Sequence, residues 1–221
     1  MKIKKNDFIE IDYTGIIKDN NEIFDTTIEK TAIDNGIKSG DFKYAPVIIA
    51  IGQSNIFKGI DDSFESKTVG DSYRIELSAE EAFGKKDSNL IKFMPTKSFT
   101  EHKINPVPGL HIDVDGVMGI IRVVSGGRTL VDFNHQLAGR DVIYEIGIRR
   151  IVEDKLEKLR ALFHNIIHYE PEIKVMDNEV VVSIPETLNI NENEIHSKIS
   201  ELIPEITNLK FNHIKNHNQK N

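Results

Sequence analysis

The sequence contains no cysteine and no tryptophan. Without cysteine, the chain cannot form disulfide bonds, thiolate nucleophiles, cysteine-ligated zinc sites or iron–sulfur clusters. No apolar run approaches the roughly 20 residues that a membrane-spanning helix requires. The basic N-terminus is not followed by the apolar core of a secretory signal. We therefore expect no membrane insertion and a cytoplasmic location.

Basic residues are fewer than acidic residues in this sequence. The 221 residues include 28 Lys and Arg against 35 Asp and Glu, which gives a formal net charge of -7 at pH 7. Tight binding to a phosphate backbone needs clustered cations, so we expect no nucleic-acid partner. The composition, with 39% hydrophobic and 29% charged residues, is typical of a globular chain. Its length suits two or three compact units.

Alternating residues and β-branched runs in the first half of the chain predict β-strands, because strand side chains alternate between two faces. The predicted strands cover residues 8–13, 22–25, 46–51 and 72–78. Residues 15–21 are rich in turn-forming types, and residues 28–44 lack periodicity and are expected to form a loop. Helical spacing predicts one short helix over residues 56–64. Its apolar residues are Ile56, Phe57, Ile60 and Phe64.

A second β-rich region follows. Three short strands are predicted over residues 111–114, 117–124 and 129–133. The dipeptides Asp115-Gly116 and Gly126-Gly127 join them and favour tight hairpin turns. A longer alternating strand is predicted over residues 140–152. One face of it carries Val142, Tyr144, Ile146 and Ile148.

The last third of the chain predicts a small α+β domain. Apolar residues recur at helical steps over residues 153–169, which predicts an amphipathic helix. Asn191 is placed to cap a second helix, with Glu194 at the capping-box position. Three strands are predicted over residues 173–175, 180–184 and 209–213. An Asp177-Asn178 turn joins the first two, so the element order is α-β-β-α-β.

A few acidic and histidine side chains have spacings that metal sites use. Asp113 and Asp115 resemble the start of a calcium loop, but the later ligand positions are missing, and a hairpin turn explains them better. His164 and His168 lie four residues apart on a predicted helix, with no third ligand evident. The pair formed by His213 and His217 is no stronger. No nucleotide-binding or nucleophile-elbow motif occurs, so we expect no metal and no cofactor.

Five short motifs follow one another along the chain. They are Asp12-Tyr-Thr-Gly15, Glu22-Ile-Phe-Asp-Thr-Thr27, Ile51-Gly-Gln-Ser-Asn-Ile-Phe-Lys-Gly-Ile60, Glu80-Glu-Ala-Phe-Gly84 and Val131-Asp-Phe-Asn-His-Gln-Leu-Ala-Gly139. In this order and spacing they resemble the FKBP-type peptidyl-prolyl cis-trans isomerases. The stretch Asn134-His-Gln-Leu-Ala-Gly139, placed after an insertion in the flap, is similar to the SlyD-like subtype. The added C-terminal domain resembles the long archaeal members of the family.

The resemblance implies an α+β fold, in which an antiparallel FKBP half-barrel wraps around one short helix. A small β-rich flap domain is inserted into it, and a C-terminal α-β-β-α-β domain follows. The isomerase domain is expected over residues 1–86 and 133–152. The inserted domain is expected over residues 87–132 and would bind unfolded chain. The C-terminal domain is expected over residues 153–221.

The resemblance also implies a substrate pocket. Its catalytic positions correspond to Tyr13, Asp25 and Phe83. Its substrate-binding positions correspond to Phe24, Val47, Ile56, Phe57, Ile60 and Tyr144. Phe83 stands where many members have a hydrogen-bonding tyrosine, and Ile60 stands where many have a tryptophan, so weaker macrolide binding is expected. Asp25 follows an apolar strand residue, and we expect it to be part-buried with Tyr13 as its hydrogen-bond partner. The alternative is an aspartate on the surface.

The implied function is peptidyl-prolyl cis-trans isomerisation, together with chaperone action on unfolded or proline-containing polypeptides. The reaction breaks no covalent bond, and an apolar pocket that fits the twisted amide is chemically sufficient. The alternative is a non-catalytic holdase with an FKBP-like scaffold, since Phe83 lacks the usual hydroxyl. The apolar helices of residues 153–221 could form a homodimer. Alternatively, their own sheet could cover both helices and leave a monomer.

Overall fold

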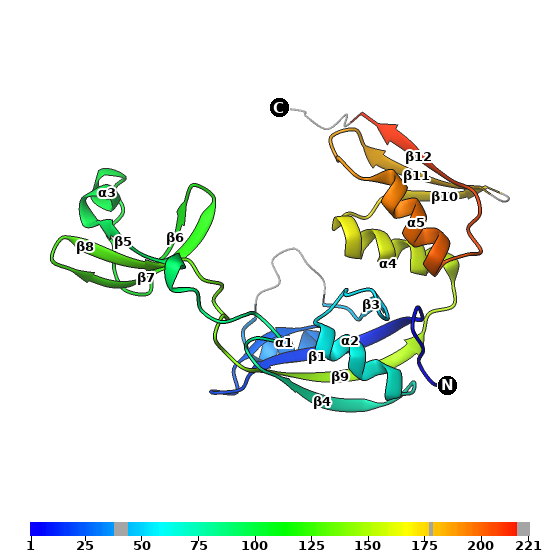
Figure 1. Cartoon of the computed structure of the whole chain (residues 1–221), viewed down its shortest axis with the longest axis horizontal. Helices are drawn as coiled ribbons and strands as arrows, with labels where there is room; N and C mark the ends of the chain where they lie inside the picture. Colours follow the sequence, from blue (N-terminus) through cyan, green and yellow to red (C-terminus); the bar gives the residue numbers. More distant parts are fainter. Residues whose placement is uncertain (38–43, 177–178, 216–221) are drawn as a thin grey trace. The chain divides into compact units, whose positions relative to one another are not determined.

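The structure, a computed structural model, describes residues 1–37, 44–176 and 179–215 (Figure 1). The chain divides into two compact units. The first unit comprises Met1–Ile16, Glu22–Ile75 and Ile143–Asn221. The second unit comprises Ile17–Asn21 and Glu76–Val142. Sheets and short helices occur in both units, which confirms the predicted α+β class.

The first unit is built on a five-stranded sheet. Its strands are β1 (Phe8–Ile17), β2 (Ile23–Thr26), β3 (Val47–Ala50), β4 (Ser72–Leu77) and β9 (Val142–Ile151). They pair in the order β2-β1-β9-β4, and β3 pairs with β1. The pairings of β1 with β2 and with β3 are antiparallel. All the strands predicted for this part of the chain are therefore confirmed.

Strand β1 extends further than predicted. Residues 15–17 were expected in a turn, but they continue the strand, with Gly15 opposite Asp25. The prediction was wrong because this glycine permits a close contact and does not form a turn. A Cβ atom at Gly15 would lie 2.5 Å from the ring of Phe24, so the missing side chain lets that ring lie across β1.

Two short helices accompany the sheet. They are α1 (Glu29–Asp34) and α2 (Lys58–Ser63), and α2 runs into the 3-10 turn η1 (Phe64–Ser66). The second helix confirms the prediction for residues 56–64. The prediction of a loop over residues 28–44 was wrong at α1, which buries only Ala32 and so has no apolar periodicity to detect. Residues 38–43 of that segment lie outside the described residues.

The second unit contains a four-stranded antiparallel sheet in the order β5-β8-β7-β6. Its strands are β5 (Ile91–Pro95), β6 (His111–Val114), β7 (Val117–Ser125) and β8 (Arg128–Asp132). The three predicted strands β6 to β8 are confirmed, as are the turns at 115–116 and 126–127, whose residues all have positive φ. Strand β5, helix α3 (Thr96–Glu101) and the 3-10 turn η2 (Ser88–Leu90) were not predicted.

The C-terminal part of the first unit has the predicted order α-β-β-α-β. Its elements are α4 (Lys155–Ile167), β10 (Glu172–Met176), β11 (Glu179–Pro185), α5 (Glu192–Leu202) and β12 (Leu209–Ile214). Asn191 Oδ1 accepts the N–H of Glu194 at 3.3 Å, which confirms the predicted cap of α5. The predicted turn at residues 177–178 lies outside the described residues. Among the described helices, none is both long and apolar enough to span a bilayer.

This C-terminal part shares a hydrophobic core with the five-stranded sheet. Phe8 of β1 belongs to the same buried cluster as Phe163 of α4. Asn165 Nδ2 of α4 donates a hydrogen bond to the Ile48 carbonyl of β3 at 3.1 Å. Much of the apolar stripe of α4 is therefore covered by its own chain. Homodimerisation through residues 153–221 stays a prediction, and this packing favours the monomeric alternative.

Candidate active site

The ring of Tyr144, on β9, lies at the centre of an aromatic cluster. Tyr144 is 5% exposed. The ring centroids of Tyr13 and Phe24 each lie 5.9 Å from that of Tyr144, and the Phe57 centroid lies 6.0 Å from it. The rings meet in tilted or edge-to-face contacts, which aromatic pairs favour. These four side chains form an aromatic cradle whose walls come from β1, β2, β9 and the residue before α2.

Asp25 places a carboxylate beside the aromatic cradle. The Tyr13 hydroxyl donates a hydrogen bond to Asp25 Oδ2 at 2.7 Å, and Tyr13 is the partner that was predicted. Asp25 is exposed, so the prediction that it would be part-buried was wrong. The reason is topological, because β2 stands at one end of the sheet order and the Asp25 side chain keeps contact with water, whereas Thr26 of the same strand is buried.

The electrostatics of the cradle keep its hydroxyls protonated. Burial raises the pKa of Tyr13, and the hydrogen bond and negative charge of Asp25 raise it further. Burial also raises the pKa of Tyr144, and the Asp25 charge adds to the effect. Tyr13 therefore remains a hydrogen-bond donor to the carboxylate throughout the neutral pH range.

The remaining predicted wall residues of the first unit differ in burial. Val47 begins β3 and Ile56 directly precedes Phe57, and both side chains are half-buried. Ile60 lies in α2 and is fully buried, so it belongs to the core of the unit. Val47 and Ile56 thus retain surface that a ligand can reach.

Phe83 belongs to the second unit, whereas the other predicted site residues belong to the first. Its ring stacks on His135 with the centroids 4.7 Å apart and 3° between the planes. His135 Nδ1 accepts the backbone N–H of Leu137 at 3.2 Å, which assigns the proton of the neutral ring to Nε2. His135 lies in the 134–139 motif, but no role was predicted for it.

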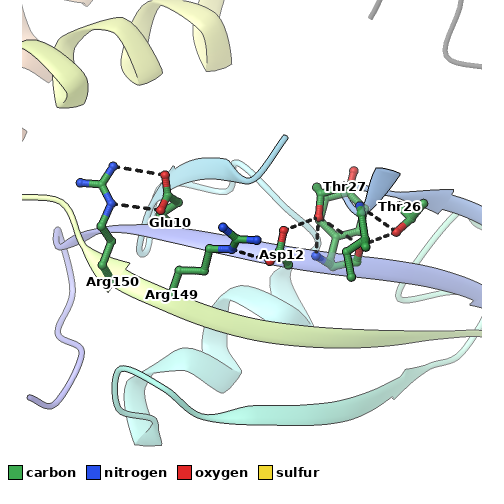
Figure 2. Close-up of polar contacts among 8 residues, drawn as sticks. Glu10, Asp12, Thr26, Thr27, Arg149 and Arg150 are labelled. Carbon is green, nitrogen blue, oxygen red and sulfur yellow. Dashed lines mark hydrogen bonds and ion pairs between the residues drawn. The ribbon is translucent and has the colours of Figure 1, made fainter. Parts of the chain in front are cut away.

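Figure 2 shows a polar network beside β1, around the Asp12 carboxylate. It contains Asp12, Thr26, Thr27 and Arg149. None of these was predicted as a functional residue, although two consecutive threonines directly after Phe24-Asp25 were a usable signal. Strands β1, β4 and β9 also line a groove of about 520 Å³ that includes Asp12.

In the second unit, Asp132 joins the chain segments that lead into and out of the inserted sheet. It is 3% exposed and lies 3.1 Å from both Lys86 Nζ and the Arg122 guanidinium. Asn134 donates to it through its backbone and side chain, and also bonds both backbone groups of Asp87. Burial opposes ionisation of Asp132, but the hydrogen bonds from Asn134 and Lys86 outweigh burial and lower the pKa to about 2.

Known proteins match this chain along most of its length. Residues 1–104 match the family described as FKBP-type peptidyl-prolyl cis-trans isomerase. Residues 92–137 match the FKBP26, IF domain. The FKBP-type 16 kDa peptidyl-prolyl cis-trans isomerase of Escherichia coli is 30% identical over 111 residues, which cover 48% of this chain and 74% of that protein. The chain therefore belongs to the FKBP-type peptidyl-prolyl cis-trans isomerase family.

Two further relatives agree with this assignment. The short-type peptidyl-prolyl cis-trans isomerase of Methanocaldococcus jannaschii is 28% identical over 149 residues, covering 67% of this chain and 94% of that protein. The FKBP-type isomerase SlyD of Vibrio cholerae is 26% identical over 163 residues, covering 71% of this chain and 73% of that protein. The predicted isomerase activity and the SlyD-like resemblance are thereby confirmed.

Proposed function

We propose that the aromatic cradle and the Tyr13–Asp25 pair are the site at which this chain isomerises prolyl peptide bonds. The proposal rests on the 2.7 Å hydrogen bond that holds the Asp25 carboxylate beside four clustered rings. An apolar surface suited to a proline ring thus adjoins one oriented carboxylate. The half-buried Val47 and Ile56 complete the proposed wall, and the fully buried Ile60 would form its floor.

The chemistry requires little more than this arrangement. The barrier to rotation, roughly 18–20 kcal/mol, comes from amide resonance, and uncatalysed exchange takes tens of seconds or longer. The planar amide is more charge-separated than the twisted one. An apolar cradle therefore destabilises the planar form relative to the twisted form. Binding that fits the twisted form best lowers the barrier without any nucleophile.

Asp25 provides the polar element of the proposed mechanism. It would interact with the prolyl carbonyl or the amide that twists, whose charge distribution changes along the reaction. A charged group that is already oriented toward the reacting amide stabilises the transition state more than a group that must reorient during the reaction. Tyr13 supplies this preorganisation, because its protonated hydroxyl donates to Asp25 Oδ2 and restrains the carboxylate.

We further propose that the inserted region, residues 87–132, binds unfolded polypeptide and delivers it to the isomerase site. Six large apolar side chains of this region are exposed, and the most exposed are Phe93 at 68%, Met118 at 59%, Val117 at 53% and Val123 at 48%. Exposed apolar side chains gathered in one small domain are typical of a protein-binding surface. A client held there would have a high effective concentration at the catalytic site, often in the mM range. Cytoplasmic proline-containing chains are the expected clients.

A protease-free prolyl-tetrapeptide assay tests the proposed site. Asp25→Ala should lower kcat/KM by about tenfold or more, which corresponds to about 1.4 kcal/mol. Its circular dichroism spectrum should match that of the native chain. Asp34→Ala, at an exposed position in α1, is the matched control and should keep full activity. Full activity of a folded Asp25→Ala variant would exclude the proposed role, and an inactive native chain would support the holdase alternative.

A proline-limited refolding assay tests the proposed client surface. The double variant Phe93→Ser with Met118→Ser should spare tetrapeptide turnover, because a short peptide needs only the catalytic site. Catalysis of refolding should fall sharply, because the client loses its tether. An equal loss in both assays would mean that the inserted region supports the isomerase structurally and does not capture clients.

A further inference from the structure

The polar network around Asp12 connects residues of β1 and β9 to Thr26 and Thr27, at the end of β2 (Figure 2). Strand side chains alternate, so Asp12 projects to the opposite side of β1 from the Tyr13 ring. Asp12 Oδ2 accepts a charge-assisted hydrogen bond from Arg149 Nε of β9. Asp12 Oδ1 accepts a second hydrogen bond from the hydroxyl of Thr27, at 3.0 Å. The Asp12 carboxylate therefore links β1 and β9 to the residue that follows β2.

Thr27 links this carboxylate to the backbone of Tyr13. Its hydroxyl oxygen accepts the Tyr13 N–H at 2.9 Å while the hydroxyl donates to Asp12. The Thr27 N–H in turn donates to the Tyr13 carbonyl at 3.0 Å. Because β2 ends at Thr26, the Thr27 hydroxyl takes the place of the carbonyl that a longer strand would offer to the Tyr13 N–H.

Thr26 provides a second anchor on the same backbone. Its hydroxyl oxygen lies 3.1 Å from the Tyr13 carbonyl and 2.9 Å from the hydroxyl oxygen of Thr14. Thr26 and Thr27 are buried, at 4% and 6% exposure. Both backbone groups of Tyr13 are thus held by the two residues that directly follow Asp25. These hydrogen bonds connect the segment that carries Asp25 to the segment that carries Tyr13.

We propose that Thr27, supported by Asp12 and Arg149, is a positioning residue for prolyl isomerisation. It sets the position of Tyr13 relative to Asp25, and through this pair it aligns the carboxylate with the substrate amide. The inference rests on the catalytic role proposed above for Asp25. The Tyr13 N–H donates to the Thr27 hydroxyl, and this hydroxyl donates to Asp12. Because the two hydrogen bonds point the same way along this chain, each polarises the next. The charge-assisted hydrogen bond from Arg149 holds the Asp12 carboxylate in place at the end of this chain.

Removing the Thr27 hydroxyl tests this role. Thr27→Val keeps the branched shape but leaves the Tyr13 N–H without its acceptor. Since a misplacement of about 1 Å can reduce turnover roughly a hundredfold, we expect a loss of about tenfold in kcat/KM for a prolyl tetrapeptide. Thr27→Ser restores the hydroxyl and should recover most of the activity. Thr129→Val is the matched control, because it removes a buried threonine hydroxyl of the second unit, paired with Thr96 at 3.1 Å.

A double-mutant cycle distinguishes positioning from general destabilisation. In the Asp25→Ala background, Thr27→Val should cause no further loss of kcat/KM, because the carboxylate that it aligns is absent. The same tenfold loss in both backgrounds would overturn the proposal, and so would full activity of Thr27→Val alone. If Asp25→Ala itself retained activity, the proposed catalytic site would be wrong, which is a separate result.

A second variant keeps the test decisive if Thr27→Val does not fold. Asp12→Asn removes the charge at the half-buried end of the network and keeps the side-chain shape. We expect a loss of about threefold in kcat/KM that also disappears in the Asp25→Ala background. Unchanged activity of folded Asp12→Asn, or a loss that persists without the Asp25 carboxylate, would overturn the proposal.

Discussion

Replacing Asp132 with asparagine removes the charge at the base of the inserted sheet and keeps the shape of the side chain. The carboxylate is 3% exposed and accepts hydrogen bonds from Lys86, Arg122 and Asn134. Burial alone would raise its pKa, but the hydrogen bonds from Asn134 and Lys86 lower it from 3.8 to about 2. At about 1.36 kcal/mol per pH unit, this difference corresponds to about 2 kcal/mol of unfolding free energy at neutral pH.

The contribution of Asp132 has a defined pH dependence. Its native pKa lies below the unfolded value, so the stabilisation is complete above the unfolded pKa of 3.8 and is lost as the pH falls toward about 2. Asp132→Asn should therefore lower the unfolding free energy of the second unit by about 2 kcal/mol at pH 7. The difference between native and variant chains should shrink as the pH falls through this window.

Urea titration followed by the amide NMR signals of β7 and β8 measures this free energy in the second unit. The five tyrosines all lie in the first unit, so tyrosine fluorescence reports that unit separately. Asp115→Asn, an exposed aspartate in the β6–β7 turn, is the matched control and should change stability by less than about 0.5 kcal/mol. A loss for Asp132→Asn that is independent of pH, or one as small as the control, would refute the reasoning.

Two further predictions follow from single contacts. Phe83→Tyr should preserve or raise tetrapeptide turnover, because it adds a donor hydroxyl without a large change in ring volume. A large fall in kcat/KM would show instead that the phenyl ring stacked on His135 positions the substrate. Asn165→Ala should lower the unfolding free energy by about 1 kcal/mol in a urea titration followed by tyrosine fluorescence, because the Ile48 carbonyl loses its donor. The exposed Asn193→Ala is its control, and equal stability of the two variants would mean that the contact with β3 is not stabilising.

Local patterns predicted the elements whose signal lies within a short window. The alternation of residues 140–152 predicted β9, and the paired glycines at 126–127 predicted the β7–β8 turn. Elements with little local signal were not predicted. Helix α1 buries one side chain, and β5 is a short strand ending in Pro95 whose pairing partner, β8, follows much later in the chain. Such elements are stabilised by distant partners, which a local window does not contain.

The sequence by itself predicted which chemical groups the proposed site can use. The family resemblance placed Tyr13, Asp25 and Tyr144 in a predicted apolar cradle with one carboxylate, and the need of that carboxylate for a partner predicted the Tyr13 hydroxyl. Only the tertiary structure decided that Asp25 is exposed, since exposure depends on the place of β2 at one end of the sheet order. It also decided that Thr27 and Arg149 meet at Asp12, and that α4 packs on β1 and β3. These contacts join residues far apart in the chain, and their geometry exists only once the strands have paired.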